Sequence, residues 1–124
     1  MLNDKFFEVL KYEGSVSIVS WGHEEPHVTC TWISYLVVEN NDTILIPAAK
    51  MHSTEHDVQL NNQVILTLAA REVEGFNGYQ GTGFRIHGQA TFLESGTEYD
   101  MMKTKYPFIR KVLKVKVTNS KQLL

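Results

Sequence analysis

Short stretches of alternating apolar and polar residues recur along this chain, and turn-forming residues separate them. Residues 15–21 and 27–33 flank a Gly-His-Glu-Glu-Pro turn, which is the spacing of a β-hairpin. Alternation presents one face of each strand to a core and the other to solvent, as in antiparallel sheets. Five further extended segments are expected at residues 35–39, 43–46, 63–71, 84–93 and 112–118. Hairpin spacing and the scarcity of helical segments predict a small antiparallel barrel of about six strands.

Three short helices are predicted alongside the strands, at residues 4–12, 53–60 and 97–105. Asn3 or Asp4 can cap the first helix, and Pro107 prevents the third from continuing. Residues 75–83 contain four glycines within nine positions. This composition predicts a long flexible loop between two of the strands.

The length of 124 residues suits one domain that spans residues 1–124. The longest unbroken apolar run, residues 44–49, is far shorter than the roughly 20 residues of a membrane span, so no membrane partner is expected. The first residues lack the basic and apolar regions of a secretory signal. Cys30 is the only cysteine, which excludes an internal disulfide and fits a reducing compartment. Together these features predict a cytoplasmic protein.

Charge is distributed unevenly along the chain. Residues 1–100 carry five basic and fourteen acidic side chains, whereas residues 101–124 carry seven basic side chains and no acidic one. A basic tail of this kind can bind nucleic acid. Here the basic residues alternate with valines, which is typical of a structured strand. We therefore expect the basic strand to pack beside the acidic body or a second subunit, and we expect no nucleic-acid partner.

Two groups of potential metal ligands occur in the sequence. Residues 52–56, His-Ser-Thr-Glu-His, fit the H-x-x-E-H pattern, in which two histidines bind zinc and the glutamate acts as general base. The predicted helix spans only about two turns, and the chain is short for a metallopeptidase fold with a third ligand. His23, His27 and Cys30 form the second group, without a fourth ligand nearby. Solvated turn histidines and a buried thiol explain it more simply, so no metal is expected.

A different kind of site is indicated where the strand at residues 43–46 ends. Pro47 terminates this strand, small residues follow, and His-Ser-Thr at residues 52–54 opens a short helix. Unpaired N–H groups at a helix start, together with two hydroxyls, form an anion site suited to a phosphate monoester.

The neighbouring strand adds groups that can hold a flat ring. Thr31, Trp32, Ser34 and Tyr35 offer stacking and polar edge contacts to an aromatic ligand. A phosphate site beside a ring site describes flavin mononucleotide (FMN). The alternative is that a hydroxyl residue merely caps the helix and that Trp32 lies in the core.

An ordered series of short motifs points to a family. The motifs are Cys30-Thr31-Trp32-Ile33-Ser34-Tyr35-Leu36, Ile46-Pro47, Met51-His52-Ser53-Thr54-Glu55, Arg71, Gly81-Thr82-Gly83-Phe84 and Gly88. In this series the chain resembles the small bacterial FMN-binding proteins of the pyridoxamine 5′-phosphate oxidase-like split-barrel superfamily. The resemblance begins near Phe6 and continues to the C-terminal leucine.

The resemblance implies a six-stranded antiparallel split barrel with a Greek-key core, and a homodimer with FMN bound non-covalently at the interface. Thr31 and Trp32 would flank the flavin, residues 47–49 would lie beside its ring, and residues 51–54 would hold the ribityl chain and phosphate. The implied contacts within one chain are Cys30, Thr31, Trp32, Pro47, Ala48, Ala49, Lys50, Met51, His52, Ser53 and Thr54. The implied contacts from the partner chain are Gly81, Thr82 and Leu124.

Two positions depart from the family pattern. The family usually has Gly-Gly before the methionine, where this chain has Ala49 and Lys50. It usually has lysine where this chain has Ser53, so the phosphate would lose a direct cation. Lys50 or Arg71 is the expected replacement.

Three functions remain open at this level. The first is an electron carrier whose FMN exchanges electrons with a redox partner protein or a small-molecule donor or acceptor. The second is an FMN-dependent oxidoreductase, similar to pyridoxamine 5′-phosphate oxidase, a nitroreductase or a flavin reductase. The third is a ligand-binding barrel without redox turnover. No residue of the sequence stands out as an acid or base acting on a substrate, which favours the carrier.

Overall fold

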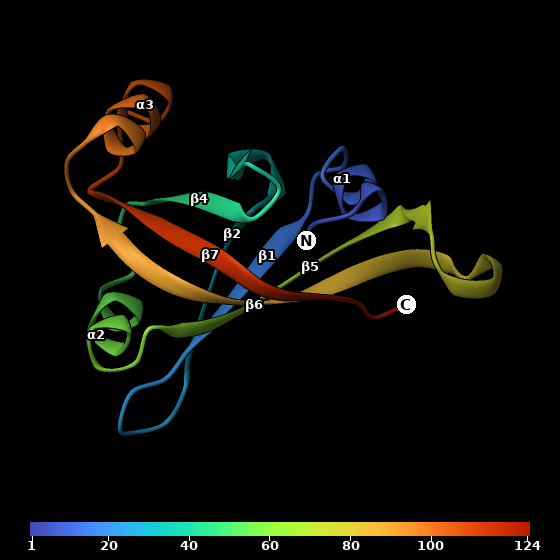
Figure 1. Cartoon of the computed structure of the whole chain (residues 1–124), viewed down its shortest axis with the longest axis horizontal. Helices are drawn as coiled ribbons and strands as arrows, with labels where there is room; N and C mark the ends of the chain where they lie inside the picture. The colour runs from blue at the N-terminus through green and yellow to red at the C-terminus, as the bar shows by residue number, and fades with distance from the viewer.

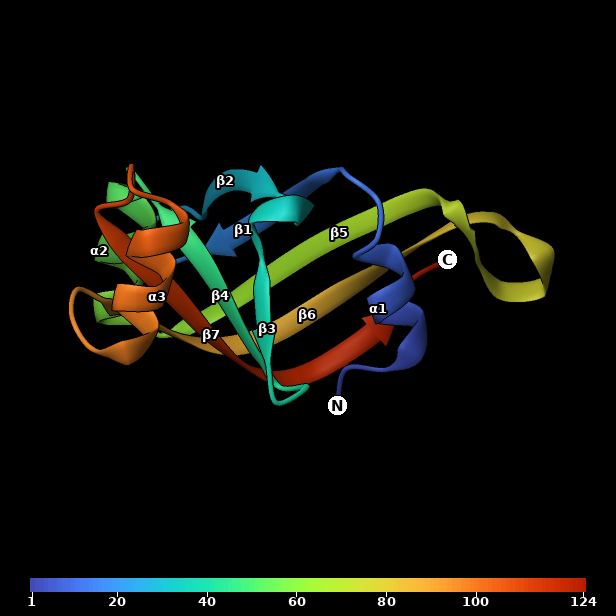
Figure 2. The same cartoon turned by 90° about the horizontal axis from the view of Figure 1, so that it is seen from above.

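The computed structural model describes residues 1–124 and consists of one curled antiparallel sheet with three short α-helices around it (Figures 1 and 2). The α-helices are α1 (Asp4–Val9), α2 (His52–Leu60) and α3 (Thr97–Lys105). The strands are β1 (Ser15–Ser20), β2 (His27–Trp32), β3 (Val37–Glu39), β4 (Thr43–Ala48), β5 (Gln63–Glu74), β6 (Gln80–Leu93) and β7 (Lys111–Gln122). The strand order is β2-β1-β5-β6-β7-β4-β3. The predicted mainly-β antiparallel fold is confirmed, with seven strands rather than six.

β3 lies within the extended segment expected at residues 35–39, and it is only three residues long. Asn40 and Asn41 adopt left-handed backbone angles, which asparagine tolerates, and they form the tight turn that joins β3 to β4. Val37, Val38 and Glu39 pair with residues 43–45 of β4 and no further. Residues 46–48 of β4 therefore have a strand neighbour on the β7 side alone. Both the other side of this segment and the outer side of β2 are sheet edges.

The glycine-rich segment is less of a loop than its composition predicts. β5 continues to Glu74 and β6 begins at Gln80, so only a short 3-10 turn, η2 (Phe76–Gly78), separates the two strands. A register shift between Ala70 and Glu74 accommodates the extra residues as a bulge. The prediction of a long flexible loop over residues 75–83 was wrong, because the glycines serve this bulged hairpin.

The main core lies on the concave face of the sheet, where α1 covers it. Asn3 caps α1 by accepting a 2.9 Å hydrogen bond from the main-chain N–H of Phe6. Phe6 is fully buried and meets Phe84 of β6 edge to face, with ring centroids 5.5 Å apart. A second, smaller cluster of Leu45, Met102, Ile109 and Val112 holds α3 against the other end of the sheet.

The basic C-terminal segment is part of the folded body. Within β7, Lys114 contacts Glu98 at 2.9 Å and Lys116 contacts Asp42 at 2.7 Å. Lys111 contacts two carboxylates, including that of Glu55. The expectation that the basic strand packs against the acidic body is thereby confirmed. None of the helices has the length and apolar character that crossing a membrane requires.

Candidate functional site

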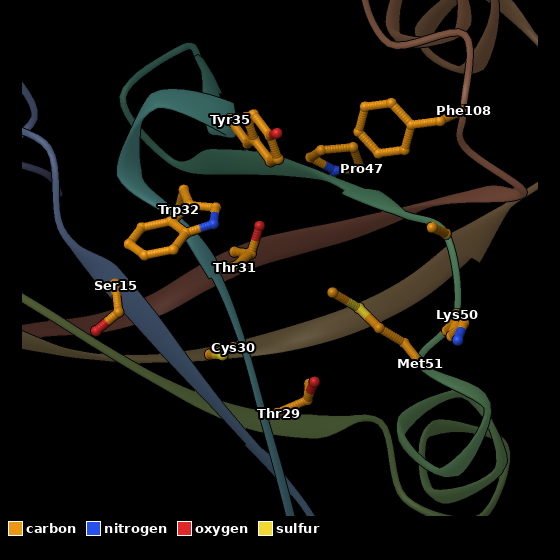
Figure 3. A pocket seen from close by; sticks show the side chains of 11 residues that line it. Ser15, Thr29, Cys30, Thr31, Trp32, Tyr35, Pro47, Lys50, Met51 and Phe108 are labelled. Atoms are coloured by element: carbon orange, nitrogen blue, oxygen red, sulfur yellow. The ribbon is translucent and has the colours of Figure 1, made fainter.

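A groove lies between the edge strand β2 and the segment that leads from β4 into α2 (Figure 3). Its volume is about 370 Å³, within the range of small-molecule sites. Residues 29–32 form one wall, and Pro47 with residues 49–51 forms the other. In Figure 3 the Met51 side chain extends from the connection toward β2. The groove exists because β3 is short and leaves this part of β4 without a neighbour.

Aromatic side chains surround one end of the groove. Trp32 and Phe108 line it while keeping 51% and 54% of their surface exposed, so a ligand can reach both rings. Tyr35 lies between them, 5.9 Å from Phe108 and 5.2 Å from Tyr106, measured between ring centroids. The Tyr106 hydroxyl donates a 3.3 Å hydrogen bond to the main-chain carbonyl of Ser34. This end offers flat apolar surface of the kind that stacks on an aromatic ring.

The other end of the groove is polar. A second cavity of about 370 Å³ is lined by His27, Val28, Thr29 and residues 51–54, so it shares Thr29 and Met51 with the first. Met51 adopts left-handed angles (φ 67°), and the chain turns there directly into α2. The first intrahelical bond runs from the Glu55 N–H to the Met51 carbonyl. The preceding amides of α2 have no partner inside the helix and can bind an anion.

Glu13 fixes the backbone that carries the aromatic end. Its carboxylate accepts hydrogen bonds from the main-chain N–H and the side-chain hydroxyl of Ser34, at 3.0 and 2.6 Å. These bonds lower the pKa of Glu13 below its ordinary value. The main-chain N–H of Ile33 also donates to the Gly14 carbonyl. The 3-10 turn η1 (Ile33–Tyr35) is held in this way at the end of β2.

An ion-pair cluster fixes the opposite wall. Arg110 donates through Nη2 to the Lys50 carbonyl at 2.9 Å and to the Glu55 carboxylate at 2.8 Å. Lys111 donates to the second oxygen of the same carboxylate. The hydrogen bond from Lys111 lowers the pKa of Glu55, and the bond from Arg110 adds to this against the effect of burial. The β4–α2 connection is thus tied to β7.

Asp57 attaches α2 to the β1–β2 hairpin. It is almost fully buried and accepts hydrogen bonds from the Ser20 hydroxyl at 2.8 Å and from His27 Nδ1 at 2.7 Å. Burial alone would raise the pKa of Asp57, but the bonds from His27 and Ser20 outweigh it and leave the pKa below its ordinary value. The helix start is therefore positioned against β2 by a buried, ionised carboxylate.

The predicted site residues fall into two groups. Ten of the eleven positions implied within one chain line the two joined cavities, namely Cys30, Thr31, Trp32, Pro47, Ala49, Lys50, Met51, His52, Ser53 and Thr54. Ala48 is the exception, because it is fully buried and lines neither cavity. Arg71, Gly81, Thr82 and Leu124 lie together around a separate hollow at the β5–β6 hairpin. Figures 1 and 2 show this hairpin at the opposite end of the molecule from α2.

Arg71 cannot replace the family lysine within its own chain. Val64 of β5 is aligned through Ser20 with His27 at the polar end of the groove. Arg71 is seven residues further along β5, or roughly 23 Å at 3.3 Å per residue. Lys50 lines the aromatic half of the groove but not the cavity at the helix start.

The histidine motifs do not converge on a common centre. No group of three or more His, Cys, Asp or Glu side chains lies close enough to hold a metal ion. Glu55 of the H-x-x-E-H segment is engaged by Arg110 and Lys111 instead. His27 of the second group is engaged by Asp57, and Cys30 is exposed rather than buried as expected.

Sequence inspection missed several residues that line the groove. Phe108 follows Pro107, and an aromatic residue directly after a helix-ending proline is a signal that the chain offered. Ser15 and Thr29 line the groove because of how β1 and β2 pair, and Ser15 is the partner of Trp32. No local sequence motif marks either residue. The sequence places His27 at the start of a strand and among possible metal ligands, but no local pattern links it to the polar end of the groove.

The sheet is curled and antiparallel, and a groove lies between its open edges. Flat apolar walls in this groove lead to the start of a helix. This architecture is a split barrel. The chain belongs to the pyridoxamine 5′-phosphate oxidase family, whose model matches residues 2–123. This confirms the resemblance inferred from the motif series. The chain is also 41% identical over 124 residues, the full length of both proteins, to the FMN-binding protein of Nitratidesulfovibrio vulgaris (strain DSM 19637 / Miyazaki F).

Solved structures share the fold at low sequence identity. HupZ of Group A Streptococcus superposes with a TM-score of 0.81 at 13% identity, over 99% of this chain and 94% of that one. An FMN-binding protein of Syntrophomonas wolfei subsp. wolfei gives a TM-score of 0.69 at 16% identity, over 95% of this chain and 88% of that one. These likenesses concern the fold alone.

Proposed function

We propose that this protein binds one FMN per chain, non-covalently, as a homodimer, and that it carries electrons. The observation that carries the proposal is the continuity of the groove, because its aromatic half and its helix-start half share Thr29 and Met51. From His27 to Trp32 the groove follows β2 for about 17 Å, five residues at 3.3 Å each. An elongated ligand with a ring at one end and an anion at the other fits this arrangement.

The residues present fit each part of FMN. Trp32 and Pro47 offer apolar surface on the two sides of the aromatic half, where the isoalloxazine ring would lie. Ser53 and Thr54, with the free amides of α2, offer hydroxyl and N–H donors to the phosphate. The full-length relative at 41% identity is named an FMN-binding protein, which supports the same ligand.

The electron-carrier role is supported by what lines the aromatic half. FMN, when bound, supplies one- and two-electron redox chemistry. No carboxylate or imidazole is among the eleven residues that line this half. The ionisable side chains there are those of Cys30, Tyr35 and Lys50. We therefore assign to the chain the tasks of positioning the ring, excluding water from part of it and binding the phosphate.

The homodimer is supported by the incompleteness of the groove and by an uncovered sheet face. Trp32 leaves half of its surface exposed, so one chain covers the ring only in part. Beside it, small residues of β1 and β5 lead across the convex face to Leu123 and Leu124, which are 42% and 46% exposed. A second copy on this face would bring its hairpin group of Gly81, Thr82 and Leu124 to the first copy's flavin.

The test is to purify the protein and identify what it binds. We expect a yellow protein with a flavin spectrum, one FMN released per chain by mass spectrometry, and tighter binding of FMN than of riboflavin by fluorescence quenching. Equal affinity for the two flavins would refute the phosphate site. Turnover with NAD(P)H or a screened substrate would instead favour an FMN-dependent oxidoreductase of the same family.

A further inference from the structure

His27 occupies a distinctive position at the phosphate end of the groove. It lines the cavity that the start of α2 also lines, and its side chain is 41% exposed. Its Nδ1 lies 2.7 Å from Oδ2 of Asp57, a side chain that is only 4% exposed. Because an ionised carboxylate accepts hydrogen bonds but cannot donate them, Nδ1 carries the hydrogen. Nε2, on the opposite side of the ring, has no hydrogen-bond partner in the chain.

The same cavity contains no lysine or arginine. Its lining side chains are those of His27, Val28, Thr29, Met51, His52, Ser53 and Thr54. The other candidate cations are placed elsewhere, since Lys50 faces the aromatic half and Arg71 lies at the far hairpin. Among the side chains that line this cavity, only a histidine can therefore provide a positive charge to a bound phosphate.

We infer that His27, oriented by Asp57, is the cationic partner of the ligand's phosphate and takes the place of the lysine that this chain lacks at Ser53. The inference rests on the proposed function, because it assigns a role at the same site. His27 binds the phosphate through Nε2–H when protonated. Because a phosphate beside the ring favours the charged imidazolium, phosphate binding and proton uptake by His27 are coupled.

His27 is better suited to this role than His52. Asp57 restrains the His27 ring and balances its positive charge, and a buried carboxylate behind an imidazole is an established way to fix its tautomer. His52 is exposed and has no hydrogen-bond partner. It also lies in the first turn of α2, where the helix dipole disfavours a positive charge.

Several titratable groups lie around His27. From α2, Asp57 contacts the ring, His52 shares the cavity, and His56 acts on Asp57 through space. β1, the neighbouring strand, contributes no titratable side chain. The adjoining turn, residues 21–26, adds His23 and two glutamates.

The first experiment compares FMN and riboflavin affinities of the wild type, His27→Gln and His87→Gln by fluorescence quenching, from about pH 6 to about pH 8.5. Loss of one charge-assisted hydrogen bond corresponds to about a tenfold change in Kd. We expect His27→Gln to weaken FMN binding about tenfold at the acidic end and much less at the alkaline end. Riboflavin binding should not change. The matched variant His87→Gln, on β6 and lining neither cavity, should keep the wild-type affinities and pH profile.

The phosphate monoester has its own ionisation near pH 6, and the His27→Gln profile measures that contribution separately.

A second measurement needs no variant at all. The imidazole resonances of the wild-type protein are titrated by NMR without ligand, with riboflavin and with FMN. We expect the pKa of His27 to rise on adding FMN and to stay in place on adding riboflavin.

Three outcomes are distinguishable. If FMN binds but His27→Gln leaves the ratio of FMN to riboflavin affinity unchanged, the inference is wrong. It is equally wrong if the pKa of His52 rises with FMN while that of His27 does not. If neither flavin binds the wild type, the proposed function itself fails, and the inference fails with it.

Discussion

The Thr82 hydroxyl donates a 2.8 Å hydrogen bond to the main-chain carbonyl of Leu124. The Gln122 side chain reinforces this contact by donating to both partners, at 2.8 Å to the carbonyl and 3.1 Å to the hydroxyl. Gly75 leaves the space that the end of the chain occupies, because a Cβ at this position would lie 2.8 Å from the carbonyl carbon of Leu124. The last residues are therefore held in place beside the hairpin.

Deleting Leu123 and Leu124 tests whether this ordered end serves a second subunit. Both side chains are substantially exposed, but the deletion also removes the hydrogen bonds that the last two residues make with Thr82, Gln122 and Gly83. We therefore expect the fold to be kept with a modest fall in melting temperature. We expect a weaker dimer by analytical ultracentrifugation and a bound flavin that iodide quenches more readily. Thr82→Val, which keeps both leucines and loses only the hydroxyl, should have a smaller effect. A truncated protein with unchanged association and quenching would contradict the dimer geometry.

Replacing Ser53 with lysine puts at the start of α2 the residue that the family resemblance implies there. The added ammonium group can reach a phosphate in the cavity that Ser53 lines. We expect FMN binding to tighten by about tenfold, the value of one charge-assisted contact, with riboflavin binding unchanged. Fluorescence titration with both flavins measures the difference. Equal tightening for both would show that the new side chain acts on the ring and not on the phosphate.

Replacing Trp32 with alanine removes one wall of the aromatic half. Loss of a stacking contact of about 0.5–1.5 kcal/mol corresponds to a roughly two- to twelvefold increase in Kd. Because the wall contacts the ring, we expect the same factor for FMN and riboflavin, and little change in melting temperature. Tyr12→Ala is the control, since Tyr12 is exposed and lines neither cavity. A loss of affinity for FMN but not for riboflavin would mean that Trp32 contacts the phosphate end of the ligand and not the ring.

Asp57→Asn tests the link between α2 and the β1–β2 hairpin. The pKa of Asp57 is below its ordinary value in the folded protein, so its carboxylate stabilises the fold above about pH 4, and this contribution is lost as the pH falls through the folded pKa. We expect the variant to lose roughly 1–3 kcal/mol near neutral pH, the cost of disrupting a buried charged hydrogen bond. Urea unfolding at several pH values checks this, and the difference between variant and wild type should shrink on acidification. A difference independent of pH would mean that shape, not charge, holds the contact.

Gly88→Ala tests the packing of β6 against β7. A Cβ at Gly88 would lie 2.5 Å from Val115 Cγ1 and 2.8 Å from the Lys116 carbonyl oxygen, at the register shift next to His87. We expect a loss of about 1–3 kcal/mol in the free energy of unfolding, as for overpacked cores. Gly14→Ala, where the nearest atom is 3.3 Å from the added carbon, should cost less. Chemical denaturation of both variants provides the comparison.

The strands were the most predictable part of the fold, because alternation in segments such as Ser15–Ser20 follows directly from one buried and one exposed face. The residues at which individual strands begin and end were less predictable. β5 and β6 continue through the glycine-rich segment because pairing between long strands stabilises a conformation that glycine tolerates but does not favour. β3 was expected within residues 35–39, but it begins only at Val37, because residues 33–35 form the 3-10 turn η1.

Much of the candidate site was accessible from sequence because it lies on two short continuous segments, residues 30–32 and 47–54. Residues that enter from elsewhere were not. Phe108 reaches the groove through the packing of α3, and Ser15 reaches it through the register of β1 against β2. The role of His27 depends on a contact with Asp57 thirty positions away, which no pattern in the sequence indicates.

The shortness of β3 also has a consequence for local motion. The groove lies between two sheet edges, so the outward main-chain amides of β2 have no strand to pair with. Unpaired amides and their neighbours at an edge exchange with solvent without global unfolding, whereas the amides of central strands need it. A ligand in the groove would bridge the two edges. Hydrogen exchange at β2 and at the start of α2 should therefore slow when ligand binds, while exchange in β5 and β6 should follow overall stability.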